Sequence, residues 1–208
     1  YGAVAVGAFV HALALPLTEP ALASLAALAM MIGYRFVLAD RDERFLRRSF
    51  AFYLAPEVIN TMVASGKMPA LGGEMRNVTM FFSDLSGFSS IAETMTPGEL
   101  VTLMNEYLSA MTDIIEGHGG YVDKYIGDSI VAMFGAPADD PAHARNAVRA
   151  ALKCHEILAD LNANNAVFAG HGLSHRIGLN SGEAVVGNIG SRRRFNYTVM
   201  SDTVNVAS

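Results

Sequence analysis

The sequence has few of the residues that stabilise a secreted scaffold or a nucleic-acid-binding domain. It contains one cysteine among 208 residues, which excludes a disulfide framework and gives no sign of an oxidising compartment. It has no tryptophan, and its 15 basic residues are outnumbered by 20 acidic residues, for a formal charge of −5. Because a general nucleic-acid binder needs a basic face, this balance argues against nucleic acid as a partner.

Charged residues are scarce overall and almost absent from the first 39 positions. They make up 17% of the chain, whereas hydrophobic residues make up 51%, and the mean hydropathy is +0.29. Residues 1–39 contain one acid, Glu19, and one base, Arg35. The apolar fraction excludes a disordered chain. Its uneven distribution indicates that one segment of the protein lies outside water.

Residues 1–39 have the pattern of a transmembrane helical hairpin whose first helix is truncated. Two apolar stretches, 1–15 and 21–39, flank the turn-forming segment Pro16–Pro20. A helix of the second stretch's length extends about 28 Å, close to the roughly 30 Å of bilayer hydrocarbon. Several arginines follow within 40–48, which places that end, and the rest of the chain, in the cytoplasm at an inner or plasma membrane. The alternative is a buried helical hairpin in a soluble protein.

Residues 40–73 are predicted to be a juxtamembrane connector. They have a helical pattern interrupted at Pro56 and end in a loop at Leu71–Gly73. From residue 74 onward the chain alternates the patterns of strands and helices, which is typical of an α+β domain spanning 74–208.

The order of the predicted elements in this domain defines its fold class. A capping box at Thr96–Glu99 and the segment Asp139–Pro141 each begin a helical periodicity, while Gly127–Asp128 and Ser181–Gly182 predict two hairpin turns. The predicted strands are 78–83, 121–126, 129–134, 175–180 and 183–189. The resulting order, β-α-β-β-α-β-β, is that of a ferredoxin-like split-βαβ fold.

Two aspartates occupy positions from which they can form one site. Asp84 ends the first predicted strand and Asp128 lies in the first hairpin turn, and these strands can be neighbours in a split-βαβ sheet. Paired carboxylates can hold two divalent cations, which suit in-line phosphoryl transfer. The adjacent turn, 86–88, offers backbone N–H groups to a polyphosphate. Each feature is common by itself, since an aspartate at a strand end is usually an ordinary loop residue.

Taken together, four sequence blocks resemble the catalytic domain of class III adenylyl and guanylyl cyclases. The blocks are 82–88, 123–128, 176–182 and 196–205, and they occur in the order found in that family. The N-terminal hairpin and connector resemble those of bacterial membrane cyclases that carry an extracytoplasmic CHASE2 sensor. The resemblance implies a nucleotide cyclase domain, a phosphorus–oxygen lyase that converts ATP into 3′,5′-cyclic AMP and pyrophosphate for signal transduction.

The resemblance also implies a site for the metal ions and the phosphates of the substrate. Asp84, Asp128 and the backbone carbonyl of Leu85 match the ligands of two Mg²⁺ or Mn²⁺ ions. The turn that would bind the phosphates consists of Ser86, Gly87 and Phe88.

A second set of residues matches the part of the family's site that binds the nucleoside. Lys124 and Thr198 match the pair that reads the purine, and a lysine there indicates adenine. Asn205 matches the residue that orients the ribose and assists the transition state. Because four extended residues span roughly 13 Å, Lys124 and Asp128 are not expected to contact the same atoms. The family's arrangement is a head-to-tail homodimer with composite active sites.

Two alternatives to an adenylyl cyclase stay open. One is a guanylyl cyclase, and the other is a non-catalytic nucleotide-sensing or dimerisation module. The family also places a transition-state arginine four residues after Asn205, which would be position 209. We therefore expect residues 1–208 by themselves to have little or no activity.

Overall fold

The structure, a computed structural model, describes residues 1–10, 18–34, 70–191 and 193–207. The chain divides into two compact units, residues 1–53 and 54–208. Most of the predicted connector, and the end of the predicted second membrane span at 35–39, lie outside the described residues.

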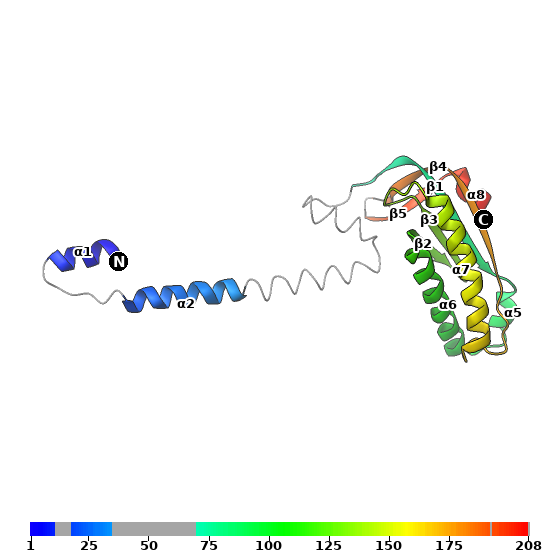
Figure 1. The fold of residues 1–208 in the computed structure, drawn as a ribbon, viewed down its shortest axis with the longest axis horizontal. Coiled ribbons are helices and arrows are strands. Elements are labelled where there is room, and N and C mark those ends of the chain that lie inside the picture. The colour runs from blue at the N-terminus through cyan, green and yellow to red at the C-terminus, as the bar shows by residue number, and fades with distance from the viewer. Residues whose placement is uncertain (11–17, 35–69, 192, 208) are drawn as a thin grey trace. The chain divides into compact units, whose positions relative to one another are not determined.

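The described part of the first unit consists of two helices, α1 (Gly2–Val10) and α2 (Thr18–Tyr34), shown in blue in Figure 1. Within the described ranges, no helix has both the length and the apolar character needed to cross a membrane. The structure therefore gives no support to the predicted transmembrane hairpin. The large apolar side chains described on both helices are exposed, among them Leu22, Leu25 and Met30.

The second unit is built on a five-stranded antiparallel sheet. Its strands are β1 (Gly72–Leu85), β2 (Gly120–Ile126), β3 (Ser129–Phe134), β4 (His175–Ser191) and β5 (Arg194–Met200), in the spatial order β2-β3-β1-β4-β5. The first four strands have the order expected of a split-βαβ fold, with β5 added at one edge. The α+β class predicted from the sequence is confirmed.

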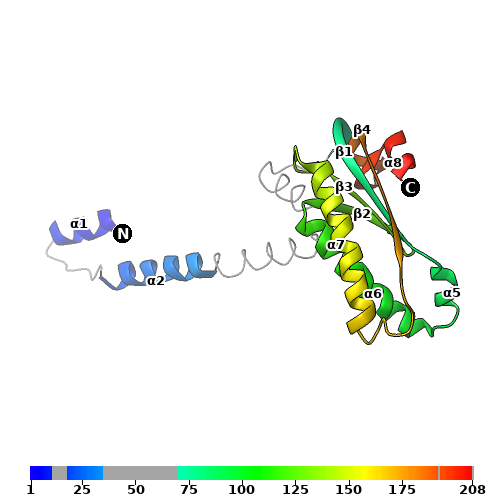
Figure 2. The same ribbon diagram turned by 45° about the vertical axis from the view of Figure 1, so that its right-hand side comes forward.

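Helices cover the two faces of this sheet unequally. The long helices α6 (Pro97–Gly117) and α7 (His143–Asn164) lie together on one face, as Figure 2 shows. On this face Phe81, Tyr107 and Phe134 are fully buried. The short helix α8 (Asp202–Ala207) packs on the opposite face, beside a smaller core that includes Met80. Apolar residues alternate between the two cores along β1, as the two-residue period of a strand requires. A further short helix, α5 (Phe88–Ala92), follows β1.

Local sequence signals correctly predict one helix start and one hairpin. Thr96 and Glu99 form the predicted capping box, in which the Thr96 N–H donates to Glu99 Oε2 at 2.9 Å. The β2–β3 hairpin turns at Gly127–Asp128, where Gly127 has a φ of 63° that favours glycine. Helix α7 begins at His143, slightly later than predicted, because Asp140 Oδ1 instead accepts the Ala142 N–H at 2.8 Å in the preceding turn.

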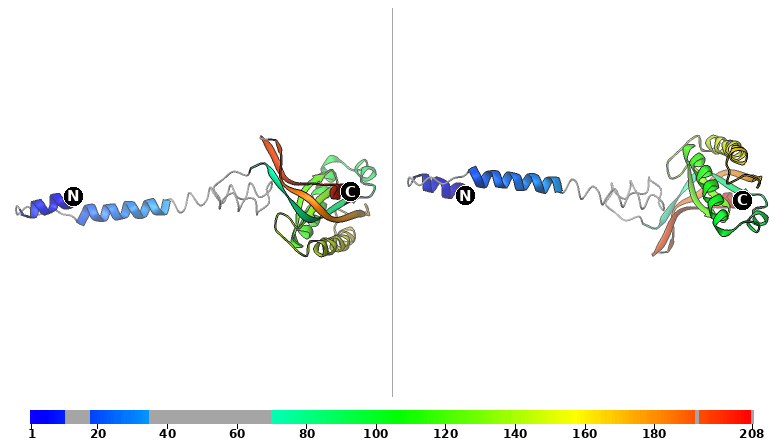
Figure 3. Two further views of the ribbon diagram at one scale, coloured as in Figure 1. Left: turned by 90° about the horizontal axis from the view of Figure 1, so that it is seen from above. Right: turned by 90° about the horizontal axis from the view of Figure 1, so that it is seen from below.

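The predicted hairpin at Ser181–Gly182 is wrong. Strand β4 continues through this dipeptide and pairs with β1 from His175 to Asn188, so that the two long strands run side by side (Figure 3). Ser181 lies opposite Thr79, and their hydroxyl oxygens are 2.6 Å apart. Pairing along the whole of β1 outweighs the local turn preference, and the chain reverses only between β4 and β5.

The predicted loop at Leu71–Gly73 is also wrong in part, because β1 already begins at Gly72. Gly73 pairs with Gly187, and a Cβ on Gly187 would collide with the Gly72 carbonyl. These glycines permit close approach of two strands rather than marking a loop.

Candidate active site

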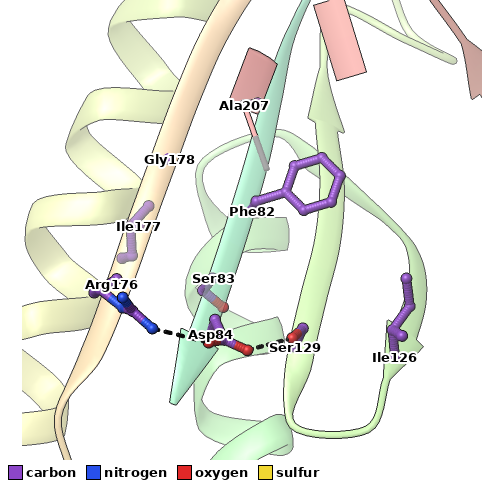
Figure 4. Close-up of a pocket in the computed structure, with 9 residues that line it drawn as sticks. All are labelled: Phe82, Ser83, Asp84, Ile126, Ser129, Arg176, Ile177, Gly178 and Ala207. Carbon is purple, nitrogen blue, oxygen red and sulfur yellow. Dashed lines mark hydrogen bonds and ion pairs between the residues drawn. The ribbon is translucent and has the colours of Figure 1, made fainter. Parts of the chain in front are cut away.

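Asp84 and Asp128 lie together at the end of β1. The Leu85 N–H donates to Asp128 Oδ2 at 3.1 Å. The hydroxyl of Ser129 donates to Asp84 Oδ1 at 2.6 Å, as Figure 4 shows. The pairing of β1 with β3 produces this arrangement, since it brings the β2–β3 turn next to the last residues of β1. One backbone donor and one side-chain donor thus hold the two carboxylates at the same sheet edge.

A cation from β4 also reaches this edge. Asp84 pairs with Arg176 across the β1–β4 ladder, and the guanidinium lies 3.5 Å from Asp84 Oδ2. Arg176 is part of a block that resembles the family, but its sequence position alone does not indicate a contact with Asp84. The fold reveals it by placing the start of β4 beside the end of β1. A hollow of about 500 Å³ adjoins these groups, lined also by Phe82, Ile126 and Gly178.

The donors at this edge fit a hard divalent cation. Mg²⁺ prefers oxygen ligands and is commonly held by one or two carboxylates together with phosphates of the substrate. Asp84 is half exposed and lines the hollow, whereas Asp128 is partly buried in the adjoining turn. Among the residues that the structure describes, no group of three or more His, Cys, Asp or Glu side chains is arranged to hold a metal ion.

The turn after β1 is only partly suited to the predicted phosphate site. Gly87 has a φ of 70°, a left-handed conformation that favours glycine. The Ser86 N–H already donates to the Ser174 carbonyl at 2.8 Å, and Phe88 packs against the helix-side core. The side chain of Leu85 is buried, and its carbonyl stays a predicted cation ligand.

Lys124 and Thr198 form a second polar cluster, on the two edge strands of the sheet. The sheet curls enough for β2 to contact β5, and the rings of Tyr121 and Tyr197 meet edge to face at 5.7 Å. Lys124 Nζ lies 3.5 Å from Thr198 Oγ1. The predicted purine-reading pair is thus adjacent within one protomer, whereas its contacts are not shared with Asp84 or Asp128.

Asn205 lies in α8, and its side chain is outside the described residues. The position of this helix depends on Gly178 of β4, because a Cβ there would collide with the carbonyl of Ala207. Gly178 therefore allows α8 to pack directly on the strand that carries Arg176.

A buried histidine, His175, lies opposite Leu85 in the β1–β4 ladder, next to the two carboxylates. His175 Nδ1 is 3.2 Å from the Tyr107 hydroxyl, the ring of His155 is 4.5 Å away, and His175 Nε2 is buried without a hydrogen-bond partner. Burial, together with His155, lowers the pKa of His175 from 6.5 to about 4. Burial likewise raises the pKa of Tyr107. The sequence predicted no role for these histidines, since their spacing matches no metal motif.

This buried histidine predicts acid-sensitive stability. Below pH 6.5 the unfolded chain takes up a proton that folded His175 resists until about pH 4, so the free energy of unfolding falls as pH drops through this window. We expect His175→Phe to remove on the order of 2–3 kcal/mol of this pH dependence. Urea unfolding at pH 7 and pH 4.5 measures it. Tyr107→Phe, which keeps the imidazole buried, should retain the dependence, and an unchanged slope in His175→Phe would contradict the assignment.

Comparison with known proteins identifies the family of this domain. Residues 72–208 match the model of the adenylate and guanylate cyclase catalytic domain, so the chain belongs to that family. It is 35% identical to adenylate cyclase 1 of Rhizobium meliloti (strain 1021) over 160 residues, which are 77% of this chain and 24% of that protein. This chain therefore spans about a quarter of that relative's length.

Solved structures of both nucleotide specificities resemble the chain. The guanylyl cyclase Cya2 is 39% identical with a TM-score of 0.61, covering 66% of this chain and 70% of that one. The adenylyl cyclase CyaB from P. aeruginosa is 33% identical with a TM-score of 0.62, covering 66% and 71%. The comparisons thus establish a nucleotide cyclase domain with adenylate cyclase relatives.

Proposed function

We propose that the protein is an adenylyl cyclase that converts ATP into 3′,5′-cyclic AMP and pyrophosphate. One observation carries this proposal: a single cyclase-family domain has a carboxylate pair at the end of the central strand β1 and a lysine–threonine pair between the outer strands β2 and β5. A lysine is only a hydrogen-bond donor, so it matches the unprotonated ring nitrogen N1 of adenine.

The reaction needs no nucleophile from the protein. The substrate's own 3′-hydroxyl attacks the α-phosphorus and releases its proton. The bond between the α-phosphorus and the oxygen that bridges to the β-phosphorus breaks, and pyrophosphate leaves. Asp84 and Asp128 would hold two Mg²⁺ or Mn²⁺ ions, which when bound supply charge stabilisation for the phosphoryl oxygens. Arg176, next to Asp84, adds a positive charge where the triphosphate would lie. The protein's contribution is positioning and electrostatic stabilisation.

A homodimer with composite sites accommodates both clusters. The contacts of Lys124 and Thr198 do not overlap with those of Asp84 and Asp128. In a head-to-tail dimer, one protomer supplies the aspartates and the other supplies Lys124, Thr198 and Asn205 to the same ATP molecule.

Membrane attachment is part of the proposal and rests on the first 39 residues. They carry only two charged residues, and the described large apolar side chains there are exposed, as at surfaces that bind membranes or proteins. We place the catalytic domain in the cytoplasm, with a CHASE2-type sensor outside. The full-length protein should stay with membranes after alkaline carbonate extraction, and its release would contradict this part.

The activity is tested with the full-length protein, Mg²⁺ or Mn²⁺, and ATP or GTP. We expect cyclic AMP as the main product, and Lys124→Glu should weaken the use of ATP. Preferred formation of cyclic GMP would favour the guanylyl cyclase alternative, which the likeness to Cya2 keeps relevant. Binding of ATP without any cyclic product would favour a non-catalytic module.

A further inference from the structure

Asp123 lies at an irregularity in β2 that changes where its side chain points. The pairing of β2 with β3 shifts between Val122 and Lys124, which leaves Asp123 as an extra residue. Successive residues of a regular strand point to opposite faces, whereas a bulge redirects a side chain. Here the bulge lets the neighbours Asp123 and Lys124 both reach Thr198 on β5.

The contacts of Asp123 are short and shielded from solvent. Its side chain is 2% exposed, whereas that of Lys124 is 49% exposed. Asp123 Oδ2 lies 2.7 Å from Thr198 Oγ1 and 3.2 Å from Lys124 Nζ. A buried carboxylate therefore holds both members of the proposed purine-reading pair, of which Lys124 is exposed and Thr198 is partly exposed.

These two contacts determine which hydrogen bonds the Thr198 hydroxyl donates and which it accepts. A carboxylate next to an ammonium group only accepts, so the single hydroxyl proton of Thr198 is donated to Asp123. A lysine ammonium group only donates hydrogen bonds, so Lys124 donates one to the same hydroxyl oxygen at 3.5 Å. Thr198 Oγ1 therefore has one lone pair left to accept a hydrogen bond from a third partner, and no hydrogen left to donate to it.

We infer that Asp123 is a specificity-determining residue that makes Thr198 a hydrogen-bond acceptor for the base. Adenine presents an amine donor at position 6 and an acceptor at N1, which match Thr198 as acceptor and Lys124 as donor. In the same pose guanine presents an oxygen acceptor at position 6 and an N1–H donor, so both contacts would be mismatched. This inference rests on the proposed function, in which Lys124 and Thr198 read the purine.

The test compares ATP and GTP as substrates of the full-length protein. Asp123→Ala frees the Thr198 hydroxyl to donate, and Asp123→Asn keeps the size of the side chain but adds an amide donor, so the direction of its hydrogen bond with Thr198 is no longer fixed. We expect either change to lower the ratio of kcat/KM for ATP to that for GTP about tenfold, since hydrogen-bond complementarity drives such discrimination. The exposed Asp160, on α7, provides the control Asp160→Ala, which should leave the ratio unchanged. Circular dichroism verifies that each variant is folded.

A second comparison asks whether Asp123 acts through Thr198. In a Thr198→Val background, adding Asp123→Ala should change the ratio less than it does in the native background, because only the contact of Asp123 with Lys124 is then lost. Equal losses with ATP and GTP would indicate a merely structural role and overturn the inference, as would an undiminished effect of Asp123→Ala in the Thr198→Val background.

A binding measurement separates failure of this inference from failure of the proposed function. If the native protein forms no cyclic nucleotide, the proposed activity fails, but the dissociation constants of 3′-deoxy-ATP and 3′-deoxy-GTP still report base selection. The native protein should then prefer the adenine analogue, and Asp123→Ala should reduce that preference. An unchanged preference would overturn the role of Asp123 whichever reaction the protein catalyses.

Discussion

Replacing Asp84 or Asp128 with asparagine is expected to lower cyclic AMP formation by the full-length protein on the order of a thousandfold. Asparagine keeps the size of each side chain and an oxygen that can accept from Ser129 or from the Leu85 N–H. It removes the negative charge that a divalent cation requires. The fold should therefore persist while the chemistry is lost.

The measurement is the initial rate with Mg²⁺ and with Mn²⁺, accompanied by circular dichroism of each variant. Asp113→Asn, an exposed acid on α6, provides the control for loss of one negative charge and should retain native activity. Residual activity within tenfold of native for both site variants would show that these carboxylates are not the metal ligands of the reaction.

Mixing two variants that are each impaired with ATP is expected to restore activity if the sites are composite. A dimer of Asp84→Asn with Lys124→Glu has one site containing both lesions and one site that is intact. Because random mixing makes half of the dimers heterodimers, about a quarter of the native rate should return. Neither variant alone should approach that rate with ATP.

The control for this experiment pairs Asp84→Asn with Asp128→Asn. Both lesions then affect the metal half of a site, so every site in the heterodimer is damaged and no activity should return. Differently tagged protomers verify that heterodimers form. Failure of Asp84→Asn and Lys124→Glu to recover activity while heterodimers are present would contradict the head-to-tail arrangement.

Elements that depend on neighbouring residues were predictable from the sequence. The capping box of Thr96 and Glu99 and the Gly127–Asp128 turn are governed by contacts within a few residues, and both occur as predicted. The sequence alone also indicated the α+β class and the family. It supplied the identities of Asp84, Asp128, Lys124 and Thr198 as candidate site residues.

Features that depend on strand pairing were decided by the tertiary structure. Ser181–Gly182 has a local turn preference, but β1 supplies hydrogen-bond partners along β4 and keeps it extended. The same pairing brings Arg176 beside Asp84, and the curl of the sheet brings Asp123 to Thr198. These residues are far apart in the chain, so no local pattern encodes their contacts. The sequence by itself determined which chemical groups this cyclase domain carries, and the pairing and curvature of its sheet determined which of them meet.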